Sequence, residues 1–559
     1  MKRITQYSGM AVALFASNFA LSGELDLNAG VSTEYVIQSV EDIENDNDID
    51  SDNLIVRPFL SATYQSKDLS ALVRATHNHV RRSLDDADAS NNYTDFNYLG
   101  RYDVIENLLN LQVNGTQNYR SQSANSFLVD DFLLNAENLR KNKTNAASLT
   151  LSMPTGRYVG ISARAGISSI DSKSEAREIS PDSRQIDISS TNLDATVFIE
   201  SGRDLRPFLY DVSGTFRKSD RENNQDFESQ TVNLTVGSNV SADVSLRLLG
   251  YYENNDISRD DSITGESTNA LREFYSYGIG VAWQPSNNRF IELGWNRSTT
   301  KGRLGEDDDE DDYLSVDLRW NLSSRTSLSG SYARRFFGSS GSFRFNHNLR
   351  NWRSGITYTE NVTTNSQLLF NQEQGLFVCA NGSTDLSDCS LSDGISEEDL
   401  GPDDILVPGL INDFELNDRV VIRKALTAQT ALDLRRTRLS ASISKSNSEE
   451  VESFRDIDTI TGRLQANFQI SERTSINANL TYSDVERDTD DELTGSVIKE
   501  AGIRLERRFT RRFFASAGYR YLDRNGDTIG NAGGIQGIRG PLTDNRFSVE
   551  IRYEFDTRR

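Results

Sequence analysis

The chain alternates apolar and polar residues in one short segment after another, and each segment ends at turn residues. The series opens with Leu25–Val31 and closes with Phe547–Phe555. In a β-strand, a period of two places apolar side chains on one face and polar side chains on the other. The sequence therefore predicts an all-β fold in which every strand has one apolar face.

The connections between these segments alternate between short and long. Outer-membrane barrels combine short periplasmic turns with long external loops. We therefore expect a transmembrane antiparallel up-and-down β-barrel whose apolar faces touch lipid, rather than two stacked sheets. The longest connection spans 376–417, and the short ones are Gln65–Asp68, Pro154–Gly156, Gly202–Arg206, Ser241–Asp243, Pro285–Asn288, Ser323–Thr326, Thr363–Ser366 and Ser471–Thr474.

The pattern predicts about 24 strands, with a range of 22–26 because a misread hairpin changes the number by two. A barrel of this size has a backbone diameter of roughly 45–50 Å and encloses an aqueous lumen. The expected strands are 24–36, 53–64, 69–80, 93–104, 109–119, 145–153, 157–168, 190–201, 207–217, 229–240, 244–254, 272–284, 289–297, 312–322, 327–337, 349–362, 367–376, 418–433, 438–446, 457–470, 475–484, 497–508, 512–522 and 545–555.

The first 22 residues have the features of a cleaved signal peptide. Lys2 and Arg3 give a positive start, Met10–Ala16 forms a short apolar core, and Ala20–Ser22 supplies small residues for cleavage. The apolar core is too short for a transmembrane helix, which needs about 20 residues. The remainder, 23–559, is expected to be a single barrel domain. Because its first strand starts at once, we expect no plug domain and no TonB-dependent transporter.

Acidic residues dominate the charge of the chain, with a formal net charge of −23. They gather in Glu41–Asp52, Glu306–Asp312, Asp393–Asp404 and Asp484–Glu492. A strongly negative exterior argues against nucleic acid as a partner. The expected location is the cell outer membrane, in contact with its lipid and lipopolysaccharide. Polysaccharide and periplasmic export proteins are the further partners that we consider.

Charged residues lie in the middle of many strands, at the positions that alternate with the apolar residues. Because charge at mid-strand is costly in hydrocarbon, these residues are expected to line the lumen. Either they pair across strands and stiffen the wall, or they form a mixed-charge pore for a hydrated polymer; both can hold. The set comprises Arg57, Arg74, Arg101, Arg164, Arg217, Arg247, Asp317, Arg319, Arg463, Arg504, Arg520 and Arg552, with Glu34, Asp194, Asp211, Glu292, Glu506 and Glu550 on the same parity.

The sequence predicts no catalytic, cofactor or metal site, and we do not expect an enzyme. His77 and His79 share one strand face but lack further metal ligands nearby. The acidic run Glu306–Asp312 lacks the glycine and ligand spacing of an EF-hand loop and is expected to be a solvated loop. Cys379 and Cys389 are expected to form a structural disulfide in the oxidising periplasm.

Three segments resemble a family of outer-membrane proteins associated with PEP-CTERM/exosortase systems and exopolysaccharide loci. They are Tyr358–Thr364, Val420–Leu426 and Arg436–Ser442. The resemblance implies a role in the export or anchoring of surface polysaccharide. It implies no catalytic residues.

Three functions therefore remain open. The first is a pore that exports exopolysaccharide, the second a structural or adhesive surface protein with acidic external loops, and the third a general diffusion porin. An open lumen would favour the first function, and a lumen filled by side chains or loops would favour the second. A long connection folded inward would favour the third, and 376–417 is the candidate for it.

Overall fold

The structure is a computed structural model. No helix in the part of the chain that it describes is long and apolar enough to cross a lipid bilayer. The predicted signal peptide and the acidic segment 393–404 lie outside that part. The described residues are 23–43, 47–84, 87–121, 132–133, 139–174, 187–205, 208–222, 226–258, 272–286, 288–301, 308–364, 375–379, 389–391, 405–409, 419–451, 455–489, 492–526 and 541–556.

Twenty-four strands form one sheet and three short strands form a second. The large sheet contains β1 (Glu24–Asp42), β2 (Asn47–Gln65), β3 (Leu69–Leu84), β4 (Ala87–Ile105), β5 (Leu109–Ser121), β6 (Leu139–Met153), β7 (Val159–Ser174), β8 (Ile188–Ser201), β9 (Phe208–Arg221), β10 (Asp226–Asn239), β11 (Val244–Ser258), β12 (Arg272–Ser286), β13 (Arg289–Thr300), β14 (Asp309–Ser323), β15 (Thr326–Arg335), β16 (Gly338–Asn348), β17 (Trp352–Thr364), β21 (Val420–Asp433), β22 (Thr437–Glu450), β23 (Asp456–Ser471), β24 (Thr474–Thr489), β25 (Glu492–Arg508), β26 (Phe513–Gly526) and β27 (Leu542–Asp556). The small sheet contains β18 (Gly375–Cys379), β19 (Cys389–Leu391) and β20 (Ile405–Gly409).

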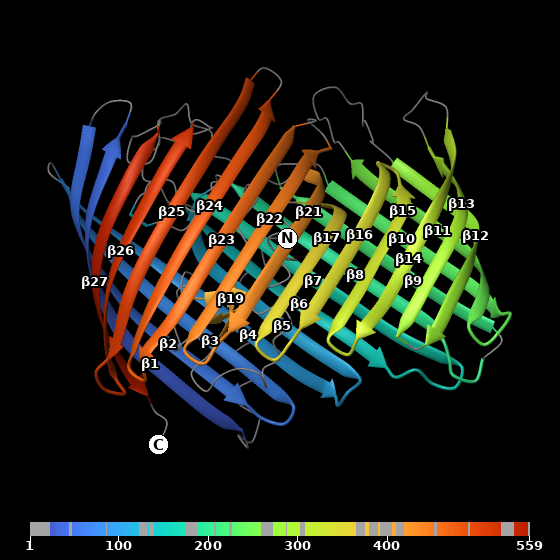
Figure 1. The fold of residues 1–559 in the computed structure, drawn as a ribbon, viewed down its shortest axis with the longest axis horizontal. Helices are drawn as coiled ribbons and strands as arrows, with labels where there is room; N and C mark the ends of the chain where they lie inside the picture. The colour runs from blue at the N-terminus through green and yellow to red at the C-terminus, as the bar shows by residue number, and fades with distance from the viewer. Residues whose placement is uncertain are drawn as a thin grey trace.

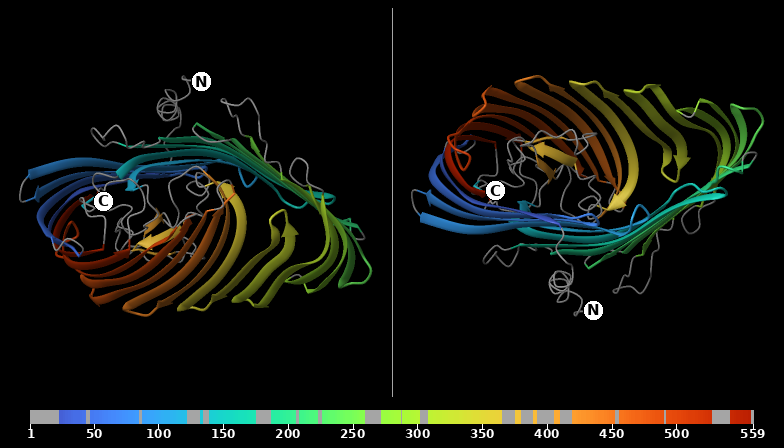
Figure 2. Two further views of the ribbon diagram at one scale, coloured as in Figure 1. Left: turned by 90° about the horizontal axis from the view of Figure 1, so that it is seen from above. Right: turned by 90° about the horizontal axis from the view of Figure 1, so that it is seen from below.

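The large sheet closes on itself. Each strand pairs antiparallel with its neighbours in the chain, and β17 pairs directly with β21. The last strand, β27, pairs with β1 in a continuous register from Asn28↔Asp556 to Asp42↔Leu542. Figures 1 and 2 show the tilted strands and the flattened outline of the resulting ring. The prediction of an antiparallel β-barrel of 24 strands is confirmed.

The two faces of the strands differ in the way that the alternation predicts. In β1, Leu25 and Tyr35 are exposed, whereas Ser32 and Glu34 on the other parity are buried. The contrast recurs around the ring, and Ile279 at the middle of β12 is 65% exposed. An apolar belt of this extent on the outside of a closed sheet requires an apolar surrounding. The outward faces therefore touch lipid.

The number of strands is predicted correctly, but two positions are wrong. The alternation misses β16, because Gly338–Ser342 contains no apolar residue. The strand expected at 367–376 has no place in the ring, since β17 pairs with β21 from Trp352↔Leu432 onward; residues 367–374 also lie outside the described residues. One strand missed and one strand too many leave the total of 24 unchanged. They do, however, reverse the direction in which β17 is expected to cross the membrane. Thr363 therefore lies at the long-connection end, not in a short turn.

The strands also continue farther than predicted at the long-connection end. The hairpin of β1 and β2 covers most of Glu41–Asp52. Strand β24 ends at Thr489 and β25 begins at Glu492, so both include residues of the acidic segment 484–492. The last four residues of the acidic run 306–312 belong to β14. The described residues of the other three acidic segments are thus mostly strand extensions rather than loops. They place carboxylates on an ordered rim beyond the membrane-spanning part.

The long connection between β17 and β21 contributes structure inside the ring. Its three strands, β18 to β20, pair antiparallel in the order β19-β18-β20. All views in Figures 1 and 2 place this small sheet, drawn in yellow to orange, within the outline of the barrel. Part of the predicted loop 376–417 is therefore folded into the lumen.

The ladder between β16 and β17 stops early. It contains six residue pairs, from Asn348↔Arg353 at the short-connection end to Phe343↔Tyr358, and is the shortest in the ring. Beyond Phe343 and Tyr358 the two strands continue with no pairing to each other, although β16 stays paired with β15 and β17 with β21. We call this interruption the seam.

Candidate functional site: the inner wall of the barrel

The inner wall contains all twelve of the predicted lumen-lining residues. The registers place each of them on the parity opposite the exposed apolar side chains. Their surroundings are not uniform, however. Some form ion pairs with carboxylates of the wall, and others are flanked only by neutral residues.

On the wall formed by β25, β26, β27, β1 and β2, arginines are held by carboxylates. Two of the pairs join neighbouring strands, and the third joins β25 to β27 across β26, so all three cross-link the sheet on its inner face. The structure thus supports the wall-pairing interpretation for this part of the ring. The nitrogen–oxygen distances are 2.8 Å for Arg57–Glu34, 3.1 Å for Arg520–Glu500 and 3.8 Å for Arg552–Glu506.

A second charged group lies on β11, β13 and β14, near the short-connection end. The Phe290 ring lies between the guanidinium groups of Arg247 and Arg319, whose carbon atoms are 4.8 and 4.4 Å from the ring centroid. Arg247 also pairs with Glu292 at 2.9 Å. Arg319 lies 3.6 Å from Asp317. Aromatic packing and ion pairing together fix these arginines against the wall.

The wall from β3 to β9 differs, because three of its predicted arginines have neutral residues on both sides in the strand register. Arg101 and Arg164 are exposed to the lumen, and Arg74 is half-buried. Arg217 lies directly opposite Asp194 in the β8–β9 register. Wall pairing therefore does not describe Arg74, Arg101 and Arg164.

Two further predicted arginines, on β23 and β25, have small or neutral residues beside them in the register. Arg463 on β23 is flanked in register by Ser442 and Thr481. Arg504 on β25 is flanked by Asn477 and Gly518. Both therefore occupy positions between small or neutral side chains of the inner face.

Neutral hydrogen-bonding side chains cover much of the wall between the charges. Their donors and acceptors suit contact with water and with hydroxyl groups. On opposite sides of the flattened ring, β5 (cyan) and β22 (orange) show this most fully (Figure 2). The inner parity of β5 carries Asn110, Gln112, Asn114, Thr116 and Asn118, and that of β22 carries Ser440, Ser442, Ser444, Ser446 and Ser448.

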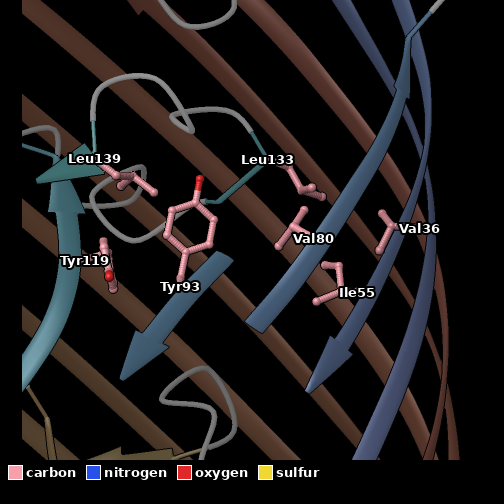
Figure 3. Close-up of a cluster of buried hydrophobic side chains, with 7 residues drawn as sticks. All are labelled: Val36, Ile55, Val80, Tyr93, Tyr119, Leu133 and Leu139. Atoms are coloured by element: carbon pink, nitrogen blue, oxygen red, sulfur yellow. The ribbon is translucent and has the colours of Figure 1, made fainter. Parts of the chain in front are cut away.

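The inner face becomes apolar near the long-connection end, which the sequence pattern does not predict. In the cluster drawn in Figure 3, inward residues of β1 to β4 meet Leu133 from the β5–β6 connection. Leu133 is only 4% exposed. Leu133 and the adjacent Phe132 thus pack on the inner side of the wall. The cluster consists of Val36, Ile55, Val80, Tyr93, Tyr119, Leu133 and Leu139.

A further apolar cluster joins opposite parts of the ring at the same end. Phe227 of β10 is fully buried against residues of β17 and β21, although β11 to β16 separate these strands in ring order. Phe336 and Phe337, from the turn between β15 and β16, pack on the same cluster. The contact crosses the lumen and narrows it beside the seam.

The histidines and cysteines do not add a reactive site. His77 and His79 bond Thr94 and Asn92 of β4, each at 2.8 Å. No group of three potential metal-ligating side chains occurs in the described ranges. Cys379 and Cys389 are paired residues of β18 and β19. Directly opposite positions suit the geometry of a disulfide, and the bond itself stays a prediction.

The closed, lipid-facing sheet defines the class of protein: a β-barrel of the bacterial outer membrane. Only a closed barrel or a helix satisfies its own backbone hydrogen bonds inside a bilayer. The short connections then lie on the periplasmic side and the long ones outside. The molecule's own strand ladder establishes this assignment.

No protein-family model and no curated protein matches the sequence. Among solved structures, the chain is similar to a ferric enterobactin receptor (PfeA) mutant of Pseudomonas aeruginosa, with 12% identity, 94% of this chain and 81% of that chain covered, and a TM-score of 0.35. It is also similar to the FrpB iron transporter of Neisseria meningitidis, with 10% identity, 94% of this chain and 81% of that chain covered, and a TM-score of 0.39. A third similar structure is the siderophore receptor PirA of Acinetobacter baumannii, with 8% identity, 94% of this chain and 80% of that chain covered, and a TM-score of 0.40. Likenesses this distant carry no argument about function.

Proposed function

We propose that this protein is an outer-membrane pore through which exopolysaccharide leaves the cell. The observation that supports this best is the amide and hydroxyl lining of the facing strands β5 and β22. Such groups exchange hydrogen bonds between water and sugar hydroxyls at little net cost. A polymer can slide along a wall of this kind without being held at one point. Periplasmic export proteins would deliver it to the short-connection end.

The small sheet β18–β20 supports a second candidate, a general diffusion porin. A connection folded into the lumen narrows the path, as a constriction loop does. In an exporter the same sheet would act as a gate that moves when polymer arrives. The two candidates differ in whether large polymers pass when this sheet is removed.

The test compares adjacent residues on opposite faces of β22. Ser442→Trp places an indole in the lumen, whereas Ile443→Trp places it on the lipid-facing side, where Ile443 is 56% exposed. We expect surface polysaccharide to fall several-fold with Ser442→Trp and to stay near wild type with Ile443→Trp. Each variant replaces the wild-type gene, and equal barrel levels are verified.

Loss of the gene with no change in surface polysaccharide would reject the export function. Single-channel recording separates the remaining candidates. If removal of 375–409 raises conductance but no polymer enters, the diffusion porin is favoured. A protein that stays electrically silent after this removal would point to a structural or adhesive role.

A further inference from the structure

Three arginines on the β3–β7 wall share an uncommon setting. Arg74, Arg101 and Arg164 each have neutral residues on both sides in the strand register. No carboxylate among the described residues lies within 4.0 Å ion-pairing distance of them. The flanking residues are Ser61 and Asn97 for Arg74, Ser70 and Gln112 for Arg101, and Thr150 and Thr196 for Arg164.

The described carboxylates of this wall have partners other than the three arginines. Aspartates are short, and several are held against the wall by neutral donors, whereas arginine side chains reach farther into the lumen. Asp194 lies opposite Arg217, so we leave that arginine out of the set. The wall's own hydrogen bonds run from Asn78 to Asp95 at 2.9 Å, from Asn110 to Asp103 at 2.6 Å, and from Thr155 to Glu200.

The three arginines also follow one another around the wall. With strands about 4.8 Å apart and about 3.3 Å per residue along a strand, the registers separate consecutive arginine positions by roughly 14–16 Å. Guanidinium groups bind carboxylate, sulfate and phosphate through paired hydrogen bonds. Several weak anion-binding sites, one after another, attract an anionic polymer into the lumen without holding it there.

We infer that Arg74, Arg101 and Arg164 form a track for an anionic polysaccharide, which we call the arginine track. The inference rests on the proposed export function and adds the charge of the substrate to it. The net charge of the whole chain, −23, would by itself repel an anionic polymer. Attraction of such a polymer therefore needs a local cause inside the lumen.

The experiment measures block of single-channel current by three polymers on one backbone: dextran, carboxymethyl-dextran and dextran sulfate of equal length. The full-length protein is reconstituted in planar bilayers at low salt, where exposed charges are least screened. We expect the anionic dextrans to block at roughly tenfold lower concentration than dextran, as three charged contacts in the lumen allow. The comparison of the two anionic polymers shows whether carboxylate or sulfate is preferred.

Two variants isolate the track. Arg74→Gln/Arg101→Gln/Arg164→Gln should abolish the preference for anionic dextrans, while the same substitutions to Lys should keep part of it. The control, Arg325→Gln/Arg436→Gln/Arg473→Gln, removes the same charge from exposed periplasmic turns and should keep the preference. Heat-dependent gel mobility verifies that every variant forms the barrel.

Equal block by dextran and its anionic forms in the wild type would overturn the track and leave the proposed export function standing. So would a preference that survives the Gln variant, or that is lost equally in the turn control. Failure of all three dextrans to block the wild-type pore would instead reject polymer passage itself, and the track with it.

Discussion

Glu34 and Glu550 lie directly opposite each other in the ladder where β1 and β27 close the ring. Like charges in opposed positions destabilise a sheet. Arg57 on β2 offsets this repulsion through its 2.8 Å pair with Glu34. A cation from the next strand thus stabilises the ladder that closes the barrel.

Removal of that cation should therefore weaken the closure. We expect Arg57→Gln to lower the stability of the folded barrel by about 1–3 kcal/mol, because it leaves a mostly buried carboxylate without its partner. The measurement is the midpoint of heat-dependent gel mobility. The double variant Glu34→Gln/Arg57→Gln removes both charges and should recover most of the loss; a double variant no better than Arg57→Gln would contradict this account.

The seam predicts a difference between two cysteine pairs on β16 and β17. Arg344→Cys/Thr357→Cys lies within the ladder and should form a disulfide readily. Ser340→Cys/Asn361→Cys would be opposed if the same register continued, and it should not cross-link because the strands are unpaired there. Four residues separate the two pairs along each strand, so both would have the same hydrogen-bonding class.

The test is done in a background with Cys379→Ser and Cys389→Ser and scored by gel mobility with and without reductant. Equal cross-linking of both pairs would show that the ladder continues and that the seam does not exist.

A contact between two periplasmic turns predicts a pH dependence. The Glu106 carboxylate accepts a hydrogen bond from Lys67 at 3.2 Å, and this raises the pKa of Lys67 above its ordinary value of 10.5. The Lys67–Glu106 contact therefore contributes its full share to the stability of the folded barrel below about pH 10.5. This stabilisation is lost as the pH rises through the higher pKa that Lys67 has in the folded protein. Thermal midpoints of wild type and Lys67→Met should differ by a small constant amount near neutral pH. A difference that persists unchanged at strongly alkaline pH would contradict this.

The inserted sheet predicts a redox-sensitive constriction. If Cys379 and Cys389 are joined, alkylating reagents should label them only after reduction. Loss of this cross-link should loosen β18 and β19, so we expect reductant to raise mean conductance or current noise in bilayers. Cys379→Ser/Cys389→Ser should show the same behaviour without reductant. Labelling of both thiols in the untreated protein would reject the disulfide.

Alternation along the chain predicted the inward parity of the twelve charged residues, because the strand registers carry one parity around the ring, but it did not predict that Val362 and Ile422 on the opposite parity are buried. It could not predict β16, where Gly338–Ser342 has no apolar residue. It also could not predict that Arg57 is paired while Arg74 is flanked by neutral residues. That distinction depends on strand register, which turn geometry and long-range pairing set. The inward packing of Leu133 depends on a long connection, whose path has no periodic signal.

The seam has a mechanical consequence. In a fully laddered barrel, any change in the width of the mouth must break or shear hydrogen bonds between strands. Beyond Phe343 and Tyr358 no such bonds link β16 to β17. There, β16 and β17 can separate from each other without breaking a ladder between them, and the apolar contacts of Phe227, Phe336 and Phe337 oppose that separation. The barrel thus has a place at its outer end where the wall can widen between two adjacent strands, and an apolar cluster holds those strands together.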